Sequence, residues 1–126
     1  MNKQELIDKL NEFGFPKSEY MILSGGSLLL RGLREETADI DMSVSRELAA
    51  KLDLENCHKD ELGCFVPFDD VQMKADMESR NFDVVDGFRC QTLEDILKLK
   101  RRLMRPKDIK DIERIEAWLN SENNNL

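Results

Sequence analysis

The sequence predicts a small α/β domain, in which helices cover a mixed β-sheet and a helical hairpin closes the chain. Two hydrophobic periods predict this class: apolar residues recur at helical spacing near both ends, whereas two middle segments alternate between apolar and polar residues. A glycine-rich segment also separates a strand-like run from a helix-like run, as expected where the two element types alternate. The chain has 126 residues, a length that suits one domain over residues 1–126.

The first third of the sequence predicts the order helix, strand, helix. Apolar residues at helical spacing predict a helix that Gly14 ends; they are Leu6, Ile7, Leu10 and Phe13. Residues 20–23 form an apolar run of strand length. Residues 24–27 follow as a glycine turn, and the next six residues predict a short helix that ends near Gly32.

Residues 38–45 alternate strictly and predict a half-buried strand. One face is apolar and consists of Ile40, Met42 and Val44. Asp39 and Asp41 lie on the opposite face, so both carboxylates point the same way. Ser45 is a suitable N-cap for a helix over residues 46–52, and residues 53–63 predict a loop.

The last part of the chain predicts two strands and a helical hairpin. Residues 71–77 alternate and residues 88–91 form a further short strand. Thr92 caps a helix whose apolar stripe is Leu93, Ile96, Leu97, Leu103 and Met104. Pro106 opens a last helix whose core-facing residues are Ile109, Ile112, Ile115 and Leu119. The two helices are expected over about residues 92–120, with a frayed tail over 121–126.

Composition limits the classes of function. The 26 acids exceed the 19 bases, and the net charge of −7 argues against a generally basic surface for nucleic acid. The segment from Lys98 to Lys110 is the exception, because it holds seven bases and one acid. No apolar run approaches the ~20 residues of a membrane span, and three unevenly spaced cysteines suit a reducing compartment. We therefore expect a cytoplasmic protein with no membrane partner.

Two other kinds of site are disfavoured by spacing. The three cysteines and His58 contain no paired C-x-x-C element, so a zinc site is not expected. Ser24 and Ser27 lack the flanking residues of a hydrolase nucleophile elbow. A serine hydrolase would also leave the pair of acids at Asp39 and Asp41 unexplained.

Two carboxylates on one strand face repel each other, and this repulsion costs little free energy only when both stay in water or share a cation. Asp39 and Asp41 are such a pair, and an isolated D-x-D is more often a pair of surface acids. Gly25, Gly26 and Ser27 precede the pair, and open backbone N–H groups at the start of a helix can face phosphate. Together the two features favour a metal-assisted phosphate site.

The segment SGGSLLLRGLREETADIDMSVS resembles the motif of the DNA polymerase beta-like nucleotidyltransferase superfamily. That motif is a hydrophobic strand, a GG or GS turn, a short helix and a D-x-D strand. The segment TLEDILKLKRRLMRPKDIKDI resembles the closing helices of minimal bacterial nucleotidyltransferases, including those of abortive-infection and toxin–antitoxin systems. The resemblance covers residues 20–45 and 92–119 and implies a nucleotidyltransferase-like fold.

The resemblance also implies a set of site residues. It implies a two-metal site for Mg²⁺ or Mn²⁺ with three carboxylates, two of them Asp39 and Asp41. The candidates for the third carboxylate are Asp69, Asp70, Asp76, Asp83 and Asp86. Asp76 is favoured by its place in the order of the family's acids and by its position on the polar face of residues 71–77, and Asp70, which has the same parity, is the second choice. The implied nucleotide-binding residues are Gly25, Gly26, Ser27, Lys100 and Lys107. Lys100 lies inside an apolar stripe, where a lysine needs a partner.

The function implied is transfer of a nucleoside monophosphate from a nucleoside triphosphate to an acceptor, with release of pyrophosphate. The acceptor stays open among tRNA, a protein hydroxyl and a small molecule. An alternative is a non-catalytic module of the same fold that binds nucleotide or a cognate partner protein in a toxin–antitoxin or defence system. A third hypothesis is a nucleic-acid-binding protein that uses the basic segment from Lys98 to Lys110.

Overall fold

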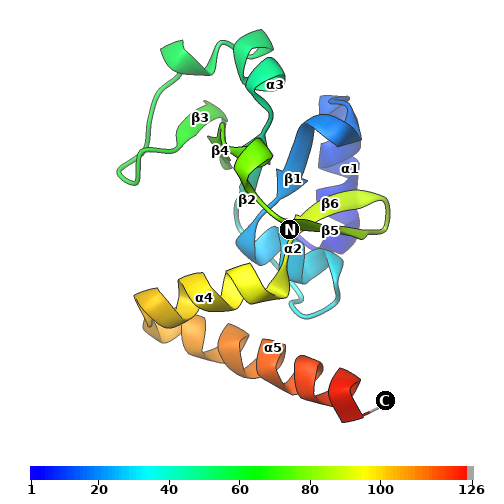
Figure 1. Cartoon of the computed structure of the whole chain (residues 1–126). Helices are drawn as coiled ribbons and strands as arrows, with labels where there is room; N and C mark the ends of the chain where they lie inside the picture. Colours follow the sequence, from blue (N-terminus) through cyan, green and yellow to red (C-terminus); the bar gives the residue numbers. More distant parts are fainter. Residues whose placement is uncertain (125–126) are drawn as a thin grey trace. The chain divides into compact units, whose positions relative to one another are not determined.

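The computed structural model describes residues 1–124, which form two compact units (Figure 1). The first unit is Met1–Gln91 and the second begins at Thr92. The boundary coincides with the predicted start of the C-terminal helices.

The first unit is built on a six-stranded mixed sheet. Its strands are β1 (Tyr20–Ile22), β2 (Ile40–Val44), β3 (Phe65–Phe68), β4 (Val71–Lys74), β5 (Phe82–Val85) and β6 (Phe88–Gln91). The spatial order is β3-β4-β2-β1-β6-β5. The β1–β2 pair and the two outer hairpins are antiparallel, whereas β2–β4 and β1–β6 are parallel. The mixed sheet with its helices confirms the predicted α/β class.

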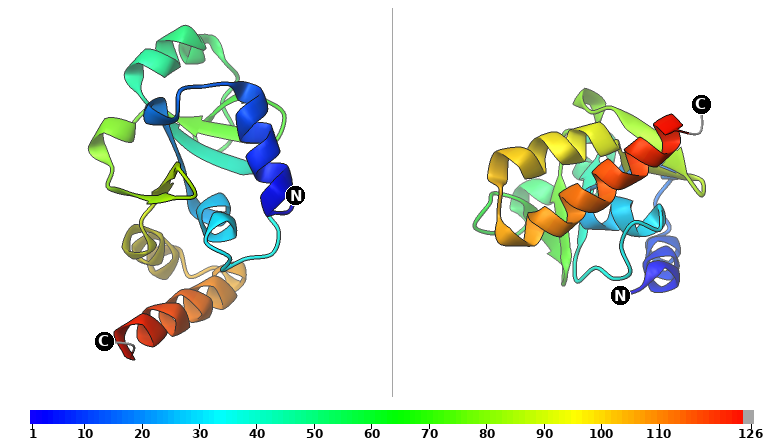
Figure 2. Two further views of the ribbon diagram at one scale, coloured as in Figure 1. Left: turned by 90° about the vertical axis from the view of Figure 1, so that its right-hand side faces the viewer. Right: turned by 90° about the horizontal axis from the view of Figure 1, so that it is seen from below.

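Helices cover the apolar face of this sheet. They are α1 (Lys3–Phe13), α2 (Ser24–Leu30) and α3 (Arg46–Lys51), with 3-10 turns at Lys17–Glu19, Leu54–Asn56 and Met77–Ser79. A capping box between Asn2 and Glu5 starts α1, and Gly14 ends it in the left-handed region at a φ of 68°. Leu6 and Leu10 from α1 join the core that the apolar sides of β1, β2 and β4 supply. Figure 2 shows α1 lying alongside the strands.

The second unit is the predicted helical hairpin, formed by α4 (Leu93–Leu103) and α5 (Pro106–Asn124). The Thr92 side chain accepts a hydrogen bond from the Asp95 N–H, as the capping pattern predicts. Met104 ends α4 in the left-handed region at a φ of 46°, and Pro106 opens α5. The two helices run side by side (Figure 2).

Several details of the helices differ from the prediction. Leu103, Met104 and Ile109 were expected in the core, but they are 45%, 57% and 47% exposed around the hairpin turn. Met104 caps α4 in the left-handed region, whereas Leu103 is the last residue of α4 and Ile109 lies in the first turn of α5, so all three are next to the turn. The tail was expected to fray from residue 121, but α5 continues to Asn124, and residues 125–126 lie outside the described part.

The glycine segment and one strand also differ from the prediction. Gly25 and Gly26 lie in the first turn of α2, which begins at Ser24, rather than in a turn before the helix. The strand expected over residues 71–77 ends at Lys74. Lys74 pairs with Ser43, which is the last pair of the ladder, although β2 continues for one more residue to Val44.

Candidate functional site

Strand β2 carries the acidic pair at the centre of the sheet. Ile40, Met42 and Val44 are fully buried on its apolar face, which confirms the predicted alternation. Asp41 and Ser43 occupy the opposite face, where Asp41 is half-buried. Asp39 precedes the strand by one residue and is exposed. The two carboxylates therefore come from one end of a strand flanked by β1 and β4.

The parallel neighbour β4 places polar residues beside this face. Its register sets Gln72 opposite Asp41 and Lys74 opposite Ser43. Asp76 follows the strand, and its Oδ1 accepts hydrogen bonds from the Ser43 Oγ at 2.6 Å and the Arg80 Nε at 3.0 Å. Asp76 is thus joined directly to β2, through Ser43 rather than through either acid of the pair.

The Asp76 carboxyl is held in its charged form. Partial burial acts to raise its pKa, but the hydrogen bonds from Arg80 and Ser43 outweigh burial and keep the pKa below its ordinary value. Nearby Cys64 is affected in the opposite direction, because burial raises the pKa of its thiol and the charges of Asp41 and Asp76 act the same way. A charged carboxylate is the form that a cation binds.

The other candidates for a third carboxylate lie at different places in the sheet. The Asp70 carbonyl accepts the Ile40 N–H at 2.8 Å, so its backbone is next to the start of β2. Asp83 pairs with Arg31 at 3.0 Å, and Asp86 pairs with Lys3 at 2.7 Å. The strand that carries Asp83 is separated from β2 by β1 and β6. Asp76 and Asp70 therefore remain the two candidates with a backbone or side-chain link to β2.

Metal binding needs several oxygen donors at one point. Asp39 and Asp41 have suitable carboxylates, but in residues 1–124 no three His, Cys, Asp or Glu side chains are gathered closely enough to hold a metal ion. The assignment of Asp39, Asp41 and Asp76 as a three-carboxylate metal set stays a prediction. The hydrogen bonds that Asp76 accepts from Ser43 and Arg80 both end on its Oδ1.

The glycine-rich start of α2 is tightly packed. A Cβ on Gly26 would lie 2.6 Å from the Cγ2 of Ile22, and one on Gly25 would collide with the Arg34 guanidinium. Ser27 is fully buried, and its Oγ donates to the Gln91 carbonyl at 2.9 Å. These residues join α2 closely to β1 and β6. This packing does not test phosphate binding, which stays a prediction for Gly25, Gly26 and Ser27.

The predicted nucleotide-binding lysines differ in their surroundings. Lys100 is 6% exposed in the hairpin, and its Nζ lies 3.3 Å from Asp108 Oδ1 and 3.1 Å from Asp111 Oδ2. The partner that a lysine in an apolar stripe requires is thus supplied within the same unit. Lys107 is exposed to solvent.

Asp108 is the centre of this buried cluster. The Arg105 guanidinium donates to it at 2.8 Å and 3.1 Å, and the Arg105 backbone N–H donates at 3.1 Å. The hydrogen bonds from Arg105, with a further contribution from Lys100, hold the pKa of Asp108 at about 2 despite its burial. The cluster closes the turn between α4 and α5.

Arg80 was not predicted as a site residue. The resemblance groups Arg105, Lys107, Asp108 and Asp111 as one cluster, but it does not predict that Lys100 lies buried between Asp108 and Asp111. Arg80 follows Asp76 by four residues, a spacing at which opposite charges meet on one helical turn, so the pair carries a signal in the sequence. The link from Ser43 to Asp76 joins residues 33 apart and has no local signal.

Searches of protein-family models, curated proteins and solved structures give no match to this chain. Across the described residues, no helix has the length and hydrophobicity needed to cross a membrane.

Proposed function

We propose that the chain is a metal-dependent nucleotidyltransferase, which moves a nucleoside monophosphate from a nucleoside triphosphate to an acceptor. The observation that carries the proposal is the polar face of β2, where Asp41 and Ser43 lie between β1 and β4 at the centre of the sheet. Helix α2 starts two residues after β1, and Asp76 is bonded to Ser43. The order of strand β1, helix α2 and strand β2 along the chain is the order that the resemblance implies, and this supports the proposal.

The residues of this face have distinct roles in the proposal. Asp39 and Asp41 would hold Mg²⁺ or Mn²⁺, with Asp76 as third carboxylate and Asp70 as its alternative. A bound divalent ion supplies charge stabilisation to the transferring phosphate and activates the acceptor oxygen. Asp76 would accept the acceptor's proton, which its charged state permits. Backbone N–H groups of Gly25 to Ser27 would contact the phosphates, and Lys100 and Lys107 would offset negative charge on the leaving pyrophosphate.

The second candidate is a non-catalytic module of the same fold that binds nucleotide or a partner protein. Two contacts favour it: Arg80 already occupies one oxygen of Asp76, and Lys100 is enclosed between two acids of its own unit. Lys100 would have to leave its two acids before its ammonium could pair with a triphosphate, and a metal ion at Asp76 would compete with Arg80 for Oδ1. A nucleotide-binding module makes no such demand.

Thermal unfolding with a triphosphate and Mg²⁺ tests binding. At a ligand concentration 100 times Kd, binding adds about 2.7 kcal/mol to the free energy of unfolding, which raises Tm. The Asp39→Asn/Asp41→Asn double variant should lose this gain. Glu35→Gln/Glu36→Gln is the matched control, because it removes two negative charges from the exposed loop before β2.

Transfer of α-labelled triphosphate into a cell extract, with pyrophosphate measured in parallel, tests catalysis. The wild type and the Glu35→Gln/Glu36→Gln control should transfer label, and the Asp39→Asn/Asp41→Asn variant should lose at least about a hundredfold in rate. A triphosphate-dependent Tm gain without label transfer or pyrophosphate would favour the binding module. A Tm gain that the double variant retains in full would remove this pair from the site.

A further inference from the structure

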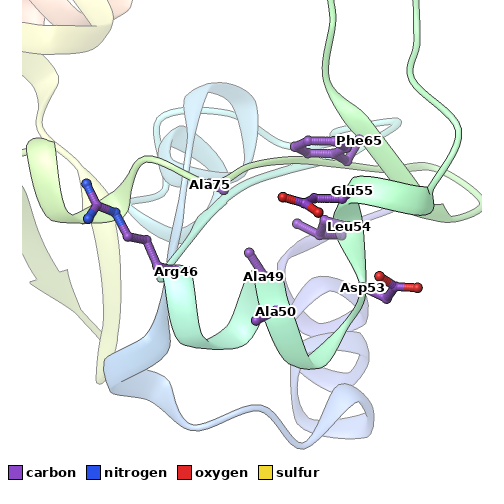
Figure 3. A pocket seen from close by; sticks show the side chains of 8 residues that line it. All are labelled: Arg46, Ala49, Ala50, Asp53, Leu54, Glu55, Phe65 and Ala75. Atoms are coloured by element: carbon purple, nitrogen blue, oxygen red, sulfur yellow. The ribbon is translucent and has the colours of Figure 1, made fainter.

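A cavity of about 460 Å³ lies beside α3 and the Leu54–Asn56 turn (Figure 3). Its apolar lining includes residues of α3 and of this turn, the first residue of β3 and the residue directly after β4; they are Ala49, Leu54, Phe65 and Ala75. Its volume falls in the range of about 300–1,000 Å³ that small-molecule pockets occupy. The cavity is therefore large enough for a small organic ligand rather than for water alone.

This cavity is separate from the acidic face of β2. Ala75 has the same parity along the chain as Val71 and Met73, whose side chains are buried in the core beneath the helices. Asp76 has the opposite parity and is bonded to Ser43 on the other face. The lining of the cavity therefore includes none of Asp39, Asp41 and Asp76.

Opposite charges stand at the two ends of the cavity. Arg46 is the first residue of α3, whereas Glu55 follows the end of that helix. Helix α3 is six residues long, about 9 Å along its axis, and the Leu54–Asn56 turn that carries Glu55 follows it after Leu52 and Asp53. Figure 3 shows the Glu55 carboxylate near Phe65 and Leu54, with Arg46 at the far end.

The side chains at both ends are available to a ligand. Arg46 and Glu55 are exposed, and among residues 1–124 neither side chain has an ion pair or hydrogen bond. The Arg46 backbone N–H donates a hydrogen bond to Glu78 Oε1 at 2.8 Å, which holds the start of α3 in place. This bond does not involve the Arg46 guanidinium. The other carboxylate of the lining, Asp53, is already bonded to the Asn56 amide at 2.9 Å and 3.1 Å.

We infer that this cavity binds an elongated dipolar molecule, an ω-amino or ω-guanidino carboxylic acid of the chemical class to which free lysine and arginine belong. The carboxylate of the ligand pairs with Arg46, and the cationic end pairs with Glu55. The methylene chain between them lies on the apolar lining, where its burial is favourable. A ligand with only one charged end can form only one of these two ion pairs.

Alanine methyl groups offer a direct readout of binding. The chain has five alanines, of which Ala49, Ala50 and Ala75 line the cavity, and Ala38 and Ala117 do not. The full chain with ¹³C-labelled alanine methyls is titrated with 6-aminohexanoate and followed by NMR. The three cavity signals should shift and saturate at millimolar ligand, while the two reference signals stay in place. Absence of any saturable shift at the three cavity methyls would overturn the inference.

A ligand series on the wild-type protein tests the dipolar requirement without any mutation. Hexanoate and hexylamine each keep one charged end, and each should bind about fivefold more weakly than 6-aminohexanoate. Equal affinity of hexylamine and 6-aminohexanoate would show that Arg46 contributes nothing and would overturn the assignment of that end. Equal affinity of hexanoate would overturn the assignment of Glu55.

Charge variants identify the two ends independently. Arg46→Gln should weaken 6-aminohexanoate about fivefold without affecting hexylamine, and Glu55→Gln should weaken it equally without affecting hexanoate. Lys51→Gln and Glu47→Gln are matched controls, because both are exposed positions of α3 outside the lining. If the control variants lose as much affinity for 6-aminohexanoate, the effect comes from net charge alone, and the proposed site is overturned.

Discussion

Replacement of Lys100 by methionine tests whether the buried charge cluster stabilises the α4–α5 hairpin. Lys100, Asp108 and Asp111 are 6%, 1% and 4% exposed, so solvent screens their interactions little. The apolar stripe of α4 alone predicts that methionine is tolerated, because it keeps the packing of the lysine stem. The structure reverses that expectation, since the substitution removes the ammonium from between two buried carboxylates.

The size of the effect follows from what remains around each acid. Removal of one partner from a buried ion pair costs about 3–5 kcal/mol. Asp108 keeps the Arg105 guanidinium and backbone N–H, which places the expected loss near the lower limit, at about 3 kcal/mol. For a chain of 126 residues this loss corresponds to a fall in Tm of about 10 °C.

Urea unfolding measures this loss with a probe inside the hairpin. Trp118 is the single tryptophan of the chain and lies on α5, so its fluorescence reports on this unit while circular dichroism reports on both. Lys98→Met is the control, because Lys98 is exposed on the same helix and its loss should change stability by less than about 0.5 kcal/mol. Identical unfolding of the wild type and both variants would refute the view that the buried cluster stabilises the hairpin.

Three further outcomes follow from particular contacts. The folded-state pKa of Asp108, about 2, lies below its ordinary value of 3.8, so its charged form stabilises the fold at higher pH and this contribution is lost as pH falls toward 2. Tm should therefore fall between about pH 4 and pH 2 more steeply in the wild type than in Asp108→Asn. Ser43→Ala removes a hydrogen bond to Asp76 and should cost about 1 kcal/mol in urea unfolding. An NMR titration should show a higher Asp76 pKa in that variant, and an unchanged pKa would contradict the bond. Gly26→Ala brings a methyl group against Ile22 and should cost about 1–3 kcal/mol, with an unchanged urea midpoint as the contrary result.

Local patterns predicted the central strands and the helices: β1 is an apolar run that is buried throughout, β2 and β4 alternate, and the helices carry an apolar stripe at helical spacing. The apolar faces of β2 and β4 follow the expected pattern, and Thr92 caps α4 as its sequence indicates. The edge strand β5 escaped prediction because its residues are mostly exposed and carry no alternation. The Asp86-Gly87 turn, with φ values of 53° and 85°, joins β5 to β6 and is the local signal in the sequence for this hairpin.

The surroundings of the site residues were harder to predict because they depend on distant partners. Alternation correctly put Asp41 on the polar face, but it extended β4 to residue 77, whereas the ladder with β2 ends at the Ser43–Lys74 pair. Asp76 therefore lies beyond the strand, bonded to Ser43 instead of aligned with the acid pair. Likewise, the position of Lys100 in an apolar stripe predicted that it needs a partner, but not which one.

The same dependence on partners changes the meaning of the basic segment between Lys98 and Lys110. Counted along the chain it holds seven bases and one acid, yet Asp111 and Glu116 from beyond the segment pair with Lys100 and Arg101. With Arg105 paired to Asp108, the bases left on the hairpin surface without such a pair among the described residues are Lys98, Arg102, Lys107 and Lys110. Each phosphate neutralised contributes about 0.9 to the slope of log affinity against log salt, so these four bases support a slope of at most about 3.6. This salt dependence is weak compared with that of proteins that bind nucleic acid through many phosphate contacts. The charge on the hairpin surface therefore suits a small phosphorylated ligand better than a long polyanion.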